Sequence, residues 1–122
     1  MRRFVDDFVD FGPGRPCFPS NIHIEFYKPL KKQVDILRED MFQVRYGDDL
    51  LNYVIDVGWY GAGFSTKGFF QVYLIKDANW QEPVLGIKCK SVKRLVPAIE
   101  RCLARLQKDT DDFRLLPPMV FP

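Results

Sequence analysis

The chain has 122 residues, of which 47% are hydrophobic and 28% charged, and its formal net charge is +2. This length fits one domain with a packed core, and the apolar content excludes a generally disordered chain. The sequence contains no apolar run of about 18 residues, the length that a membrane-spanning helix needs, so no membrane partner is expected.

An N-terminal arm, residues 1–20, comes first. Phe4, Phe8 and Phe11 lie at helical spacing, which predicts either a short helix or an irregular arm that packs its phenylalanines on the domain. Glycines and prolines in 12–16 would end such a helix.

Residues 21–90 predict a meander of antiparallel strands. Runs of β-branched and aromatic residues, separated by Gly, Pro and Asp, indicate about five of them. Their ranges are 22–27, 41–46, 51–59, 69–75 and 84–90. Strand 22–27 alternates apolar and polar residues, so we expect Ile22, Ile24 and Phe26 to face the core.

A C-terminal helix is predicted over residues 91–108, with Ser91 as its N-cap. Its apolar face comprises Val92, Leu95, Val96, Ile99, Cys102, Leu103 and Leu106, and its opposite face carries Arg94, Arg101, Arg105 and Lys108. Pro97 lies beyond the first turn and predicts a kink or a fresh start of the helix. With a tail over 109–122 that is apolar from residue 113 onward, the chain is therefore predicted to be one α+β domain over 1–122, an antiparallel sheet with the helix packed on one face.

We find no sequence motif for catalysis, for a metal or for a cofactor. The glycine spacing at 58–63 resembles a phosphate-binding loop, but Phe64 stands where the essential lysine would be. Asp56 lies midway along an apolar strand, where it faces solvent, bonds to a side chain of a neighbouring strand, or acts as a general acid or base with His23 or Glu25. We therefore do not expect an enzyme.

The three cysteines form no C-x-x-C pair. Their odd number argues against a disulfide framework and favours a reducing, cytoplasmic location. We interpret Cys17, Cys89 and Cys102 as small buried side chains and expect no metal or cofactor.

Large aromatic residues near strand ends, together with acids in the adjoining turns, supply the candidate binding residues. These are Asp48, Asp49, Trp59, Tyr60, Trp80 and Glu82. Trp and Tyr dominate protein interfaces, although these three fit lids over the core equally well. Acids beside aromatics suit a protein partner with a positive groove.

An alternative function is a small RNA-binding or regulatory module. The basic helix face, with Lys88 and Lys90, would follow a phosphate backbone, and the aromatic residues Tyr27, Tyr60 and Trp80 would stack on bases. The near-neutral total charge instead favours a solvated helix face. Direct binding of nucleic acid is therefore not expected.

The central strand pair carries a family resemblance. The run Y-V-I-D-V-G-W-Y at 53–60, the run G-F-F-Q-V-Y-L-I-K at 68–76, N-W-x-x-P at 79–83 and K-S-V at 90–92 resemble the CdiI-type immunity proteins of bacterial contact-dependent growth inhibition systems. The resemblance covers roughly residues 21–106. It implies a protein that binds the C-terminal toxin domain of a large surface-delivered protein (the CdiA-CT type), often a nuclease, and blocks its active site. No binding motif is shared across that family, so the candidate residues remain those given above.

Overall fold

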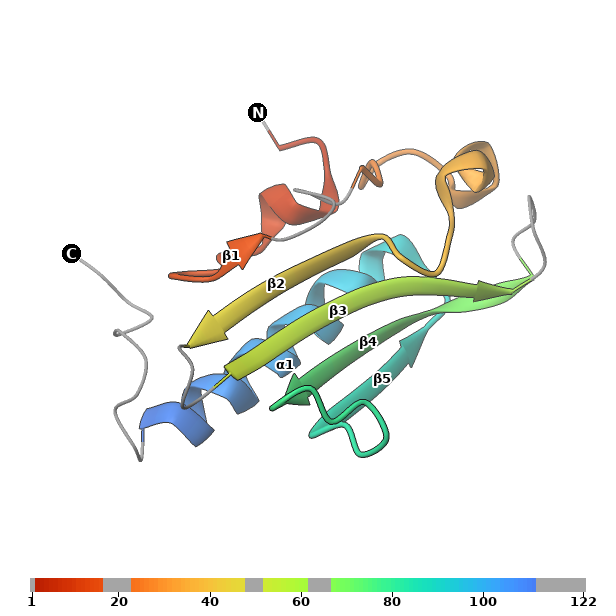
Figure 1. Ribbon diagram of the computed structural model, residues 1–122. Coiled ribbons are helices and arrows are strands. Elements are labelled where there is room, and N and C mark those ends of the chain that lie inside the picture. The colour runs from red at the N-terminus through yellow and green to blue at the C-terminus, as the bar shows by residue number, and fades with distance from the viewer. Residues whose placement is uncertain (1, 17–22, 48–51, 62–66, 112–122) are drawn as a thin grey trace.

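A computed structural model describes residues 2–16, 23–47, 52–61 and 67–111 of the chain. They form a five-stranded antiparallel sheet of order β1-β2-β3-β4-β5 with one long helix behind it (Figure 1). The elements are β1 (Arg15–Pro16), β2 (Phe42–Gly47), β3 (Asn52–Gly61), β4 (Gly68–Lys76), β5 (Leu85–Cys89) and α1 (Val92–Asp111), with 3-10 turns at Val5–Phe8, Leu30–Lys32 and Val34–Ile36. The predicted α+β fold is confirmed. In the described ranges, no helix has both the length and the apolar character needed to cross a membrane.

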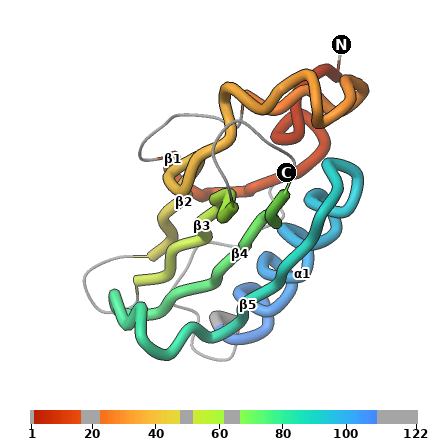
Figure 2. Tube along the Cα trace, turned by 90° about the vertical axis from the view of Figure 1, so that its right-hand side faces the viewer, coloured from red at the N-terminus to blue at the C-terminus, as the bar shows by residue number. Residues whose placement is uncertain are grey.

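The core lies between the sheet and α1, which runs along one side of the strands (Figure 2). Alternate strand residues face α1, so Val44, Ile55 and Leu74 are fully buried neighbours in adjacent strands. The predicted apolar face of the helix is confirmed, with Val92, Leu95, Ile99, Cys102 and Leu106 buried and Val96 and Leu103 partly buried. Two elements of this core, β3 and β4, pair along their whole length and form its centre.

The start of α1 follows the prediction, but Pro97 does not interrupt it. The Arg94 amide donates a hydrogen bond of 3.2 Å to the Ser91 hydroxyl, which is the expected N-cap. The helix is continuous through Pro97. Because proline has no amide hydrogen, the carbonyl of Lys93 lacks its helical donor at this exposed turn.

The predicted strand at 22–27 is wrong for the described residues 23–27, which contribute only an isolated bridge between Glu25 and Phe4. The reason is Gln33, whose side chain is 2% exposed. Its amide oxygen accepts from the Glu25 amide at 2.8 Å, and its Nε2 donates to the carbonyls of Glu25 and Lys28 at 3.0 and 2.8 Å. A side chain therefore satisfies backbone groups that a neighbouring strand would otherwise bond.

The fifth strand is supplied instead by the N-terminal arm. Arg15–Pro16 pairs with β2 as the short strand β1, and the Tyr46 hydroxyl donates to the carbonyl of Phe11 at 2.8 Å. The arm forms one 3-10 turn over Val5–Phe8, rather than a longer helix, and this turn packs against α1. The arm thus closes the sheet edge and one end of the core.

Two of the three cysteines are described, and both are buried free thiols, as predicted. Burial raises the pKa of Cys89 to about 11 and that of Cys102 to about 12. Both therefore stay protonated at neutral pH and act as small apolar side chains. Cys17 lies outside the described residues.

Candidate functional site

The sheet surface turned away from α1, here called the open face, carries the most unusual polar residue of the fold. On this face Asp56 of β3 lies between Gln43 of β2 and Tyr73 of β4. Asp56 is only 5% exposed, and its Oδ1 accepts a hydrogen bond of 2.9 Å from Gln43 Nε2. The predicted bond to a neighbouring strand's side chain is therefore confirmed.

A close backbone approach at Gly58 brings further carboxylates to this region. A Cβ atom at Gly58 would overlap the carbonyl oxygen of Glu39, so the chain before β2 lies directly on β3 at this point. The Trp59 amide donates to the carbonyl of Arg38 at 2.8 Å, which holds the two segments together. Only glycine leaves room for this contact, which places the exposed residues Glu39 and Asp40 beside the open face.

The electrostatics of Asp56 follow from its burial. Loss of water raises its pKa from 3.8 to about 6; the Gln43 hydrogen bond opposes this rise, and the nearby charge of Asp40 adds to it. The carboxylate is therefore ionised at neutral pH but close to its titration range. A perturbed acid on a sheet surface is a candidate functional group.

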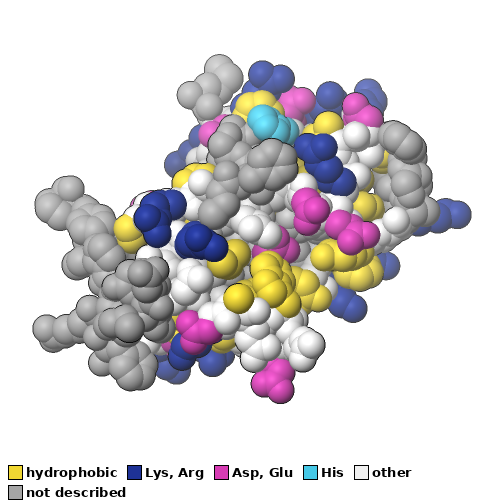
Figure 3. Space-filling model, viewed as in Figure 1, with side chains coloured by type: hydrophobic (Ala, Val, Ile, Leu, Met, Phe, Trp, Pro, Cys, Tyr) yellow, Lys and Arg dark blue, Asp and Glu magenta, His cyan; other side chains and the backbone are white. Residues whose placement is uncertain are grey.

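Two tyrosines complete the cluster. Burial is the main cause that raises the pKa of Tyr60, and the charge of Asp56 is the next, followed by Tyr73, Glu39 and Asp40. The Tyr60 ring stacks on that of Phe69 with centroids 6.1 Å apart. We call Glu39, Asp40, Asp56, Tyr60 and Tyr73 the acidic–aromatic face. Figure 3 views this side of the molecule and shows acidic side chains gathered near its centre, next to hydrophobic ones.

Small residues shape the floor around these rings. The Tyr73 ring lies against Gly86 of β5, where a Cβ atom would come within 3.2 Å of the ring. Gln71, 4% exposed, lies beside them and donates to the carbonyl of Ile87 at 3.3 Å. The phenols are thus supported from below and held in place, as binding anchors need to be.

The structure does not bring the sequence-predicted binding residues into one cluster. Tyr60 lies on the acidic–aromatic face, whereas Trp80 and Glu82 lie in the β4–β5 turn, at the opposite end of the strands. Lys76, the last residue of β4 before this turn, pairs with Tyr53 of β3. Tyr60 lies seven residues further along β3, so it is roughly 23 Å from the turn. Trp80 is 47% exposed. Asp48 and Asp49 lie outside the described residues.

Trp59 belongs to the core rather than to an exposed surface. It is 4% exposed, and its ring meets Phe70 edge-on at 4.9 Å between centroids. Its indole nitrogen is buried without a hydrogen-bond partner among the described residues. Its burial therefore fits the interpretation of Trp59 as a lid over the core, rather than as an interface anchor.

The possible catalytic partners of Asp56 lie elsewhere. Glu25 forms ion pairs with Arg3 at 2.9 Å and Lys28 at 3.5 Å. His23 is exposed, and its ring meets Phe4 edge-on at 6.2 Å. In the part of the chain that the structure describes, no group of three or more His, Cys, Asp and Glu residues is placed to hold a metal ion. The arrangement around Asp56 suits recognition of a positively charged surface.

Sequence reasoning missed Glu39, Asp40 and Tyr73, although one signal pointed to the first two. A glycine inside an apolar strand marks a close approach of another backbone, and Gly58 is such a residue. The residues that approach it could not be identified, because they come from the irregular connection 37–41 before β2.

Comparison of the chain with protein-family models, with curated proteins and with solved structures gave no match.

Proposed function

We propose that this chain is an immunity protein that binds and neutralises the toxin domain of a contact-dependent growth inhibition system, and that it binds through the acidic–aromatic face. Support for the family comes from the resemblance of residues 21–106. Support for the surface comes from one observation: the buried, hydrogen-bonded Asp56 shares its strand face with Tyr60, and the charges of Asp56 and of the exposed acids Glu39 and Asp40 all act on this tyrosine.

The chemistry of this face suits the active site of a nuclease toxin. A nuclease must attract a polyanionic backbone, so its substrate groove is positively charged. Carboxylates that lie close together present a complementary negative potential. Tyrosine rings are frequent anchors of protein interfaces because they bury a large area at low entropic cost.

The proposal is tested by a growth assay with the toxin domain encoded immediately upstream of this chain. The domain is induced in a sensitive strain with and without the protein, and both are then co-purified. We expect growth arrest that only co-expression relieves, and a stable complex. Toxicity that persists in the presence of the protein contradicts the proposal.

Charge-reversal variants test the surface. Glu39→Lys with Asp40→Lys should weaken the complex by at least about 100-fold, because like charges then meet across the interface. Two matched pairs serve as controls. Asp35→Lys with Glu100→Lys changes the same charge at exposed positions elsewhere, and Trp80→Ala with Glu82→Lys alters the β4–β5 turn. Loss of rescue in the turn variant alone would move the binding site to that turn.

A further inference from the structure

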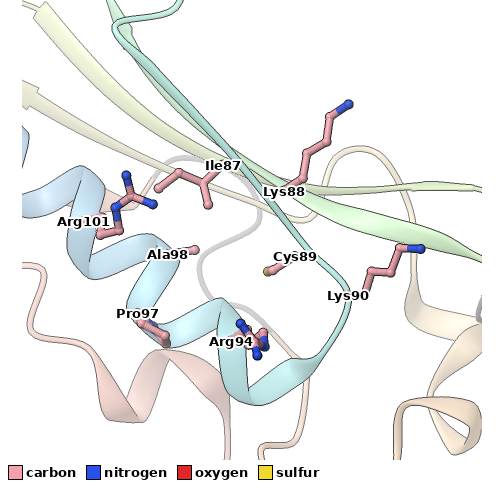
Figure 4. Close-up of a pocket in the computed structure, with 8 residues that line it drawn as sticks. All are labelled: Ile87, Lys88, Cys89, Lys90, Arg94, Pro97, Ala98 and Arg101. Carbon is pink, nitrogen blue, oxygen red and sulfur yellow. The ribbon is translucent and has the colours of Figure 1, made fainter.

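A groove between the edge strand β5 and α1 lies outside the acidic–aromatic face. It encloses about 490 Å³, and Ile87, Cys89 and Ala98 point into the space between strand and helix (Figure 4). Arg94 and Arg101 of α1 lie at its rim, and Lys88 and Lys90 line it from the strand with side chains that point away from this space (Figure 4). No acidic residue among those described lines it. The groove therefore combines an apolar floor with a positive rim.

Two further grooves continue this one across the start of α1. The next, of about 380 Å³, shares Lys90 with the first and adds Lys93 and Lys28. The third, of about 600 Å³, shares Tyr27 and Lys28 with the second. It extends the path to Arg2, Arg3 and Lys32. We call these three adjoining grooves the basic band.

Negative charge is almost absent from the basic band. Among the described residues, Glu25 is the one acid that lines it, and Glu25 is already paired with Arg3 and Lys28. Lys90, Arg94 and Arg101 are exposed, and no acid in the described part of the chain pairs with any of them. The small net charge of +2 thus includes a local surplus of cations along the basic band.

The helix also contains a contrasting pair of cations outside the band. Arg105, one of the basic residues predicted on the exposed helix face, forms a salt bridge of 3.1 Å with Asp109. Lys108 lies in the last turn of α1, far along the helix from the groove residue Arg94. These two residues do not line the band and serve as natural controls for it.

An aromatic ring stands at the junction of the second and third grooves. Tyr27 lines both and is 74% exposed, the most exposed large hydrophobic residue among those described. Its ring meets Phe26 edge-on at 5.0 Å and Phe8 at 5.9 Å between centroids, so two partly buried rings support it from one side. A fixed, exposed ring between cations is the arrangement on which an unpaired base stacks.

We infer that the basic band binds single-stranded nucleic acid, with the phosphates along Lys28, Lys90, Arg94 and Arg101 and one base stacked on Tyr27. This inference does not depend on the proposed immunity function, since it concerns a different surface. A curved path with spaced cations fits a flexible chain that carries one charge per residue. The exposed ring in the path favours a nucleic acid over an acidic peptide, which has no base to stack.

The test is fluorescence anisotropy with a labelled oligouridylate of about 12 nucleotides, titrated with the full chain at several salt concentrations. We expect the affinity to fall linearly with salt on logarithmic axes. Arg94→Ala with Arg101→Ala should weaken binding about tenfold and reduce the salt slope by about 1.4, since each phosphate contact contributes about 0.7 to the slope for single strands. Arg105→Ala with Lys108→Ala removes the same charge from the same helix and should leave both quantities nearly unchanged.

The stacked base is tested at Tyr27. Tyr27→Ala should weaken binding about tenfold, whereas Tyr27→Phe retains the ring and should bind like the natural chain. Thermal unfolding confirms that each variant is folded. The inference is overturned if the chain does not bind the oligonucleotide at low salt, or if both helix variants lose the same affinity. It is also overturned if poly-glutamate displaces the oligonucleotide equally well from the natural chain and from Tyr27→Ala.

Discussion

The acidic–aromatic face and the basic band carry opposite charges, and they are built in opposite ways. On the sheet face, Asp56 is buried and hydrogen-bonded, so its charge is costly and its pKa is raised. In the band, the cations are exposed and keep their hydration, with Arg94 and Arg101 projecting at the rim of a groove. The buried charge of Asp56 therefore affects folding, whereas the exposed cations of the band affect chiefly what the protein binds.

Each region also depends on one residue that carries no charge. Gly58 lets the segment containing Glu39 and Asp40 lie on β3. Gln33 holds the backbone of Glu25 and Lys28, and so positions Tyr27 between them. If the two regions are independent, damage to one of these residues should affect one function and spare the other.

The largest effect is expected for Gly58→Ala. The new Cβ atom would overlap the carbonyl oxygen of Glu39, a backbone atom that cannot rotate away. We expect a loss of about 4 kcal/mol in the free energy of unfolding, measured with urea, together with weaker toxin rescue. Gly86→Ala is the matched control on the same face, since its Cβ meets side-chain atoms rather than backbone, the Tyr73 ring at 3.2 Å and Gln71 Nε2 at 3.4 Å. Equal losses in the two variants would contradict the role assigned to Gly58.

A somewhat smaller effect is expected for Gln33→Met, which keeps the side-chain volume but removes three hydrogen bonds to the backbone. Unpaired backbone groups of Glu25 and Lys28 should cost about 3 kcal/mol in unfolding free energy. Binding of oligouridylate should weaken because Tyr27 is displaced, while toxin rescue persists at temperatures where the variant is folded. Gln81→Met, at an exposed position, is the control. If Gln33→Met loses toxin rescue but keeps oligonucleotide binding, then Gln33 does not support the band.

Gly58 and Gln33 also mark the limit of what could be predicted about the fold from the sequence. Local periodicity predicted the four strands between residues 41 and 90 and the amphipathic helix, because this pattern depends only on a residue and its near neighbours. Strand 22–27 had the same alternation, but its pairing was decided by Gln33, a residue beyond the strand. A two-residue strand such as β1 has no periodicity to detect.

The candidate site divides in the same way. Asp56 and Tyr60 could be chosen from sequence because an acid in an apolar strand and an aromatic at a strand end are local features. Trp59 shares its strand face with Ile55 and Val57, so its burial was already implied by the period of two. The joining of grooves at Lys90 and Tyr27 depends on tertiary packing between the segment 26–30 and the start of α1, which no local pattern describes.

The smallest expected effect, and the one with the clearest pH dependence, concerns Asp56→Asn. Folding raises the pKa of this carboxyl from 3.8 to about 6, so the folded state binds the proton more tightly than the unfolded state does. The stability of the natural chain should therefore fall as the pH rises from about 4 to about 6, and asparagine removes this loss while its oxygen still accepts from Gln43. Urea unfolding should show no difference at pH 4 and a gain of about 2 kcal/mol for the variant at pH 7. A variant less stable than the natural chain at pH 7 would mean that the charge itself holds the sheet face together, and the contrast with the solvated cations of the basic band would then fail.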